Sequence, residues 1–344
     1  MKPILFCLFL LSCFCSCNEE SEIPDVSSIK YEVVVHRFEI DFFVMDTVLL
    51  EKSLQELHQK YPELTPIFLQ QILGLDPSNI DSGIKNFIQL SGSLQKATQT
   101  EFDNFSLIQQ EFENTFRFVK YYFPEYKIPP VITLLGPVDV MAQTASGESS
   151  PNFLGPNFIG INLQFYLGKS FPLYSDNYFV TQVAPLYRSR RFEKNYMVAD
   201  VMKLVVDDFF PDNSLGKNLM EQIIEKGKQA WLLDKLMPTT ADSIKTGYTQ
   251  NQLNWCLENE GMIWNYLLNN EKNIYTTDPT IIQTYIGEAP FTAVFPQASP
   301  GNIGVWIGRQ ILKKFVEKNS TLSIQEVMQA DALKILQGAK YKPK

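Results

Sequence analysis

The densest group of carboxylates in the chain lies between residues 196 and 266, and paired carboxylates are the groups here that could support hydrolysis. Glycoside hydrolases place two carboxyl groups on either side of the bond that they cleave. Asp207 with Glu225, or Glu258 with Glu260, could fill these roles. The sequence does not set their separation in space, so a glycan or peptide hydrolase that uses a carboxylate pair is kept as the alternative function.

The histidine content argues against a zinc peptidase of the common helical type. Such an enzyme needs His-Glu-x-x-His, because positions i and i+4 place two imidazoles on one helix face. The chain has 2 histidines, His36 and His58, and they belong to different predicted elements. Lys203 and Asp207 stand four apart in the helix where the motif would lie, and we expect them to form an exposed ion pair. The sequence therefore predicts no metal site and no cofactor.

No residue is marked as a catalytic nucleophile. The chain has no Gly-x-Ser-x-Gly motif, phosphate loop or dinucleotide-binding fingerprint. Cys256 is the one cysteine after residue 17, so no disulfide can form within the folded part. It follows Trp255 on an apolar helix face, far in sequence from either histidine. We expect a buried core thiol and assign no catalytic residue.

Arg188, Arg190 and Arg191 form a local basic patch, which is the candidate binding surface. Such a patch could hold an anionic partner or a phospholipid headgroup. A solvated surface cluster that pairs with Glu193 is the favoured alternative, because charge runs are usually solvated. The chain as a whole has a net charge of −8 and no basic footprint, which argues against nucleic acid as a partner.

Helical periodicity dominates the segments that carry these residues. Apolar residues recur at helical spacing over 198–210 and 215–237, and Pro211 and Pro238 end the two runs. A third helix is predicted to open at Thr249 and to include Trp255 and Tyr266. An aromatic stripe over 102–119 is expected to belong to the core.

Strand patterns are fewer and lie in the N-terminal half. Short β-rich runs cover 30–40, 129–136 and 158–163, whereas 142–156 reads as a Ser/Gly/Asn/Pro loop. Ser299 is expected to cap a helix over 303–318, in which Gly304 and Gly308 would allow close helix packing. The predicted fold class is α+β, predominantly helical, with a small sheet from the N-terminal half.

The N-terminus has the pattern of a bacterial lipoprotein signal. Lys2 precedes a short apolar run over 4–11, too short to span a bilayer, and the polarity changes abruptly after Cys17. Cys17 is the predicted lipid attachment site, with Cys13 as the alternative. We expect a signal peptide over 1–17, a flexible tether over 18–28 and a single globular domain over 29–344. With 45% hydrophobic residues, that domain can bury a sizeable core.

Several segments resemble the gliding motility lipoprotein GldB family of Bacteroidetes. They are Arg37-Phe-Glu-Ile-Asp-Phe-Phe, Tyr61-Pro, Asp234-Lys-Leu-Met-Pro, Ile244-Lys-Thr-Gly-Tyr-Thr-Gln-Asn-Gln-Leu-Asn-Trp-Cys, Glu258-Asn-Glu-Gly-Met-Ile-Trp, Gly287-Glu-Ala-Pro-Phe-Thr, Ser299-Pro-Gly-Asn-Ile-Gly and Lys340-Tyr-Lys-Pro. The resemblance covers nearly the whole mature chain. It implies an envelope lipoprotein of the gliding machinery, with no settled catalytic residues to transfer.

The same family also resembles predicted zinc-dependent peptidases, which implies that a zincin-like helical core is possible. In that comparison the segment around Lys226 resembles a Glu-Gly-x-Ala zinc-ligand segment, with Lys226 in the place of the acid. The resemblance thus implies an inactive enzyme reused for binding. We expect a non-catalytic lipoprotein, anchored by palmitate or a similar acyl chain in the outer membrane on its periplasmic face. Its expected partner is another envelope protein.

Overall fold

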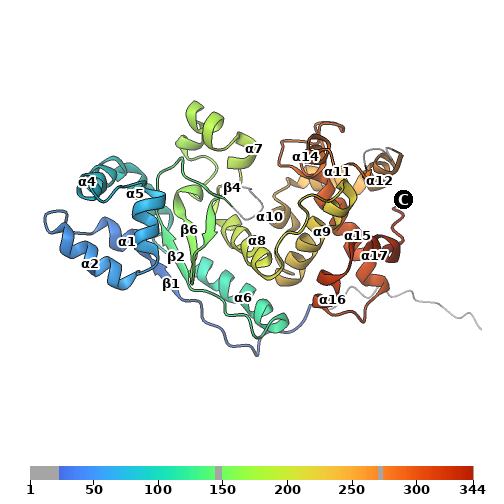
Figure 1. The fold of residues 1–344 in the computed structure, drawn as a ribbon, viewed down its shortest axis with the longest axis horizontal. Coiled ribbons are helices and arrows are strands. Elements are labelled where there is room, and N and C mark those ends of the chain that lie inside the picture. The colour runs from blue at the N-terminus through green and yellow to red at the C-terminus, as the bar shows by residue number, and fades with distance from the viewer. Residues whose placement is uncertain (1–22, 144–148, 270–273, 344) are drawn as a thin grey trace, which may run out of the picture.

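The computed structural model describes residues 23–143, 149–269 and 274–343. Helices make up most of this described chain, and a small sheet lies among them (Figure 1). The predicted class, α+β and predominantly helical, is confirmed. Cys13 and Cys17 lie outside the described residues. Within those residues, we find no helix long and apolar enough to cross a lipid bilayer.

The main sheet has four strands in the order β1-β2-β6-β5. Strands β1, β2 and β6 run parallel, and β5 is antiparallel to β6. The parallel pairing of β1 with β2 requires a long crossover, which the first six helices supply. A separate antiparallel pair joins β3 to β4. The strands are β1 (Val35–Arg37), β2 (Val131–Leu134), β3 (Ala142–Gln143), β4 (Ser149–Ser150), β5 (Asn152–Leu154) and β6 (Ile159–Asn162).

The sheet separates two hydrophobic cores, because side chains alternate between the faces of a strand. Val131 of β2 and Ile161 of β6 belong to the larger core. Ile132 and Leu134 point into a smaller core, which includes Phe38. The helices on that side are α1 (Phe38–Phe43), α2 (Leu50–Lys60), α3 (Leu64–Ile67) with a π-turn over Phe68–Ile72, and α4 (Ile80–Leu90). The next helix, α5 (Gly92–Glu101), packs Leu94 and Ala97 against the larger core.

The larger core is built mainly from α6, α8, α9 and α15, with the shorter C-terminal helices packed around them (Figure 1). Phe112 and Phe116 of the aromatic stripe are fully buried in it, as predicted. The helices are α6 (Ser106–Tyr122), α7 (Leu186–Ser189), α8 (Met197–Phe209), α9 (Leu219–Leu236), α10 (Asp242–Thr246), α11 (Gln250–Glu258), α12 (Glu260–Asn269), α14 (Pro279–Ile286), α15 (Ile303–Lys318), α16 (Ile324–Gln329) and α17 (Ala332–Ala339).

Helices α9 and α15 cross at a pair of glycines, which confirms the close packing expected at Gly308. A Cβ atom at Gly308 would overlap the backbone of Ile223, and one at Gly227 would overlap the backbone of Gly308. Two helix backbones approach this closely only where neither carries a side chain. This contact fixes α15 against α9 and so sets one side of the cavity described below.

Helices α8 and α9 confirm the predicted helices over 198–210 and 215–237, although α9 begins only at Leu219. Asn218 caps it in a capping box with Glu221. The single helix predicted from Thr249 is wrong, because the chain forms two helices, α11 and α12. The side chain of Asn259 lies between them and donates a 2.8 Å hydrogen bond to the carbonyl of Trp255, ending α11.

Three further expectations need correction. In the β-rich run only Val35–Arg37 pairs as a strand, and Phe38–Phe43 forms a helix that buries Phe38 and Phe42. The predicted loop over 142–156 contributes β5, which pairs with β6. Ser299 does not cap α15. Its buried hydroxyl accepts a 3.3 Å hydrogen bond from the N–H of Thr292, and the helix begins after Asn302.

Candidate functional site

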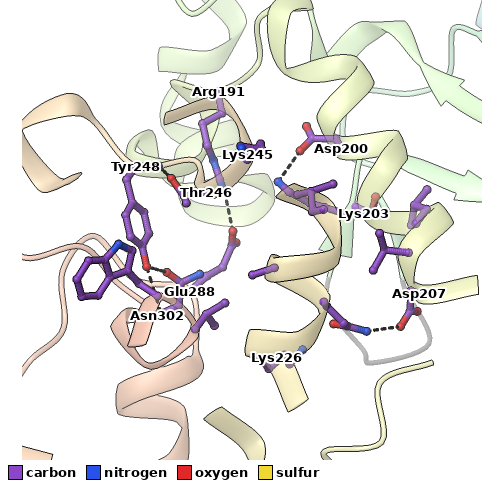
Figure 2. Close-up of a pocket in the computed structure, with 18 of the residues that line it drawn as sticks. Arg191, Asp200, Lys203, Asp207, Lys226, Lys245, Thr246, Tyr248, Glu288 and Asn302 are labelled. Atoms are coloured by element: carbon purple, nitrogen blue, oxygen red, sulfur yellow. Dashed lines mark hydrogen bonds and ion pairs between the residues drawn. The ribbon is translucent and has the colours of Figure 1, made fainter. Parts of the chain in front are cut away.

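A cavity of about 260 Å³ lies between α8, α9, α10 and the start of α15 (Figure 2). Its lining includes the apolar side chains Leu204, Leu233 and Trp306, and 10 of its 25 lining residues are charged. A second hollow of about 340 Å³ adjoins it. The two share the side chains of Arg191, Thr246, Tyr248, Glu288 and Asn302.

Helix α8 brings one row of charged residues to the cavity. Its apolar face is buried in the core, so that Asp200, Lys203 and Asp207 share the opposite face at helical spacing. The amine of Lys203 pairs with Asp200 at 3.0 Å. One Asp207 oxygen accepts a 3.1 Å hydrogen bond from the side-chain amide of Gln229. The expected exposed pair between Lys203 and Asp207 is therefore wrong, because each has its own partner and both line the cavity.

Helix α9 supplies the facing wall through Lys226 and Gln229. The amine of Lys226 lies 2.9 Å from a carboxylate oxygen of Asp212, and the two side chains are 14% and 8% exposed. Partial burial raises the pKa of the Asp212 carboxyl, but Lys226 outweighs burial and holds that pKa below its ordinary value. Asp212 thus stays ionised and fixes the Lys226 side chain.

A cluster of charges closes the end of the cavity between α9, α10 and α15; three of its members are largely buried and the fourth, Asp242, is 46% exposed. Arg309 is 3% exposed, and its Nε and Nη2 atoms each lie 2.6 Å from a carboxylate oxygen of Asp234. The same Nη2 donates to Asp242 at 2.7 Å, and Lys245 pairs with Asp234 at 2.8 Å. One acid on α9, one acid and one lysine on α10 and one arginine on α15 therefore join three helices.

The arginine patch lies where the two hollows meet. Arg191 Nη2 is 2.6 Å from one oxygen of Glu288, and Arg188 Nε is 3.5 Å from the other. The expected surface pairing with Glu193 is wrong, because Glu193 pairs with Lys169 at 3.5 Å. Arg188 and Arg191 are 15% and 19% exposed, so they are held within the cleft and not spread over the surface.

The charges in this patch act on one another. Partial burial raises the pKa of the Glu288 carboxyl, but Arg191 and Arg188 outweigh burial and keep that pKa below its ordinary value. Burial and the neighbouring Arg191 both lower the pKa of Arg190. Arg190 Nη2 donates a 2.6 Å hydrogen bond to the carbonyl of Gly247, and in the described chain no carboxylate pairs with it. The patch therefore carries an excess of positive charge.

The structure does not bring the four candidate carboxylates together. Asp207 lines the cavity, whereas Glu225 pairs with Lys217 and Lys228 outside its lining. Glu258 is exposed on α11, and Glu260 accepts a hydrogen bond from the hydroxyl of Tyr341. Neither of the two pairs considered for a hydrolase flanks the cavity.

The other residues that the sequence analysis considered, His36, His58 and Cys256, do not line this cavity. His36 on β1 and His58 on α2 are both exposed and belong to the N-terminal half of the fold. Cys256 is fully buried, as expected, and burial together with Glu260 raises the pKa of its thiol to about 12.

The comparisons with known proteins now give the family. A family model described as gliding motility protein GldB matches residues 19–343. The chain belongs to this family. A search of the curated proteins and a search of the solved structures found no match. Membership indicates a motility-associated lipoprotein of the cell envelope, and Cys17 lies before the matched range.

Four of the eight segments that carry the GldB resemblance meet at the cavity, although their lining residues are spread over 68 positions, from Asp234 to Asn302. Asp234, Thr246, Tyr248, Glu288 and Asn302 all belong to those segments, and all line it. The sequence alone does not assign these residues to a site, because they form no catalytic motif. What they share in the sequence is that each lies in a segment that resembles the GldB family. This convergence makes the cavity the candidate functional site of the GldB protein.

The site does not fit a zinc ion. Zinc in proteins takes imidazole, thiolate or carboxylate ligands. Across the described ranges, no three or more His, Cys, Asp or Glu residues are grouped so that they could hold a metal. The two walls instead present the ammonium groups of Lys203 and Lys226, each paired with an aspartate. A cation entering there would meet two fixed ammonium groups, which disfavours a metal ion at this cavity of the GldB protein.

Proposed function

We propose that this protein is a non-catalytic binding component of a gliding-type envelope machinery. It is held by a lipid on Cys17 at the periplasmic face of the outer membrane, and its cavity receives part of another envelope protein. Family membership supports the gliding-type setting. The observation that carries the binding role is the engagement of every charged group on the α8 and α9 walls.

General acid–base catalysis needs a group that can give and take a proton near the working pH. On these walls Lys203 is paired with Asp200, Lys226 with Asp212, and Asp207 is bound by Gln229. Such fixed pairs suit recognition, because a preorganised surface loses little conformational entropy on binding. The walls therefore favour binding over turnover.

The test is recovery of a partner from native envelopes. Crosslinked, detergent-solubilised envelopes that carry the tagged full-length chain should yield a defined partner protein. Thr246 lines both hollows, so Thr246→Trp should fill their junction and abolish recovery. Thr181→Trp is the matched control, because Thr181 is exposed and lines neither hollow, and it should recover the partner normally. Repeated recovery of the lipoprotein alone from wild-type envelopes would contradict the proposal.

A separate assay tests the alternative function, a hydrolase. Asp207 is the residue to change in this assay, because it is the candidate carboxylate that lines the cavity. Purified protein incubated with peptidoglycan fragments or with an unfolded protein should release no product above background. If the wild-type protein cleaves glycan or peptide and folded Asp207→Asn does not, the proposal of a non-catalytic function is wrong.

A further inference from the structure

We propose that the junction of the two hollows is a carboxylate-binding site, at which Arg188, Arg190 and Arg191 hold an acidic peptide segment of the partner protein. The inference rests on the proposed binding function and names the chemistry that this function would recognise. The observations that carry it are the local charge balance, the fixed geometry of the guanidinium groups and the recessed shape of the site.

The local charge balance is opposite to that of the whole chain. The protein has a net charge of −8, yet among the described residues the three arginines of this junction have one carboxylate as an ion-pair partner, Glu288, which contacts Arg188 and Arg191. Arg190 shares no carboxylate in the described chain and lies close enough to Arg191 for the two charges to oppose each other. A carboxylate that entered here would relieve this repulsion, since charge-assisted hydrogen bonds to guanidinium are among the strongest in proteins.

The guanidinium groups are held in place before any ligand arrives. Glu288 fixes Arg191 at 2.6 Å, the carbonyl of Gly247 fixes Arg190 at 2.6 Å, and the carbonyl of Ser149 accepts a hydrogen bond from Arg188. Figure 2 shows Arg191 pointing into the pocket toward Glu288. Arginine is suited to this role because its planar donors match a carboxylate in two bonds at once. Prior ordering lowers the entropic cost of binding.

The recessed shape favours a peptide over a membrane surface. Arg188 and Arg191 are only 15% and 19% exposed, so a flat layer of lipid headgroups cannot reach them fully. An extended chain can enter the two adjoining hollows of about 260 and 340 Å³. Polar groups of Thr246 and Asn302 line both hollows and could bind its backbone, while the apolar lining of the first hollow, which includes Trp306, could receive one of its side chains.

The experiment measures binding of a fluorescent ten-residue peptide of alternating Glu and Gly to the purified full-length protein in detergent. The same peptide with Gln in place of Glu is the probe control. Arg190→Gln should weaken binding of the Glu peptide by about tenfold, because one charge-assisted contact is lost. Lys194→Gln removes the same charge at an exposed position outside both hollows and should leave binding unchanged.

Glu288→Gln separates ligand binding from a structural role of the patch. The substitution removes the negative charge that competes for Arg188 and Arg191 but keeps an amide oxygen that can hold Arg191 in place. It should therefore strengthen binding of the Glu peptide by several-fold, whereas general loosening of the site would weaken binding. Circular dichroism and urea unfolding confirm that each variant is folded. Binding should also weaken as salt is raised, since partly exposed charges are screened.

Equal binding of the Gln peptide, or weaker binding in Glu288→Gln, would overturn the carboxylate site. Binding of the protein to phosphatidylglycerol vesicles through Arg190, with no peptide binding, would overturn it in favour of a headgroup. Failure here is distinguishable from failure of the proposed function. If Arg190→Gln recovers the partner from envelopes as well as wild type while Thr246→Trp does not, the binding role stands and only the carboxylate chemistry fails.

Discussion

At the scale of single residues, the candidate site depends on charges that are held away from water. Arg309 is the clearest example, because it is 3% exposed and contacts Asp234 and Asp242 on two other helices. Breaking a buried ion pair on one side leaves an uncompensated charge, which costs far more than the pair contributes. Exposed pairs such as Lys314 with Glu317 contribute little by comparison.

Arg309→Met should lower the free energy of unfolding by about 2–4 kcal/mol, since Asp234 loses two charge-assisted hydrogen bonds while Lys245 still pairs with it. Lys314→Ala on the same helix is the control and should change it by less than about 1 kcal/mol. Urea unfolding followed by circular dichroism measures both. A loss in Arg309→Met no larger than in the control would mean that the cluster does not stabilise the fold.

The same cluster predicts a dependence of stability on pH. Partial burial raises the pKa of Asp242, but hydrogen bonds and charge from Arg309 outweigh burial and hold that pKa well below its ordinary value. A carboxyl whose pKa is lowered on folding stabilises the fold above its unfolded pKa of about 3.9, and this contribution is lost as pH falls further. Asp242→Asn should thus be less stable than wild type at pH 7.

The gap between Asp242→Asn and wild type should narrow steadily as pH is lowered below about 4. Urea midpoints measured at several pH values test this, with Asp76→Asn as an exposed control that should track wild type throughout. A gap between the Asp242 variant and wild type that stays constant with pH would show that the difference does not arise from ionisation of this carboxyl.

Cys256 gives a prediction about reactivity. Its thiol is fully buried, and burial together with Glu260 raises its pKa to about 12, so the reactive thiolate is scarce at neutral pH. Iodoacetamide at pH 8 should label a chain that retains Cys256 alone slowly when folded and rapidly in urea. Rapid labelling of the folded protein would reveal an open path to this side chain.

At the scale of elements, the crossing of α9 and α15 positions both Lys226 and Arg309 against the cavity. The crossing depends on the absence of side chains at Gly227 and Gly308, whose Cβ atoms would collide with backbone that cannot move aside. A helix pair forced apart here would displace two walls of the site together. The packing of α9 against α15 therefore sets the shape of the cavity.

Gly308→Ala should destabilise the fold by about 1–3 kcal/mol, because overpacking forces the helix backbones apart. Gly92→Ala is the matched control. Gly92 begins α5, and a Cβ there meets nothing within 4 Å, so its replacement should be neutral or mildly stabilising. Thermal unfolding compares the two. Equal stability of both variants would show that α15 can shift without cost.

At the scale of the whole molecule, function depends on where the domain is held. The GldB family assignment supports an envelope lipoprotein. Cys17 is the predicted attachment point, and stable anchoring needs two or more acyl chains because one chain binds a bilayer only marginally. Asn18, directly after the cysteine, is not the aspartate that marks inner-membrane retention in the enteric pattern, which favours the outer membrane.

Cys17→Ser should be poorly processed and should lose its normal membrane anchorage. Metabolic labelling with a fatty-acid analogue, followed by separation of inner and outer membranes, measures both effects. Label that persists in Cys17→Ser and is lost in Cys13→Ser would move the anchor to Cys13. An unlabelled wild-type protein would defeat the lipoprotein prediction.

The sequence by itself determined the elements whose cause is local. Apolar periodicity and following prolines predicted α8 and α9, and the run of aromatic residues predicted the buried face of α6. Local rules failed where a side chain found a better tertiary partner. The hydroxyl of Ser299 accepts a hydrogen bond from Thr292 and therefore does not cap α15. Phe38 lies in a helix, and its ring is buried in the smaller core.

Only the tertiary structure decided the candidate site. Spacing along α8 predicted that Lys203 would pair with Asp207. In the structure Lys203 pairs with Asp200 on the same helix, and Asp207 accepts a hydrogen bond from Gln229 on α9. Glu288 met Arg191 from 97 positions away, a pairing that no local pattern encodes. An ion pair forms where packing brings opposite charges together away from water, and that packing is set by distant contacts such as the one between α9 and α15.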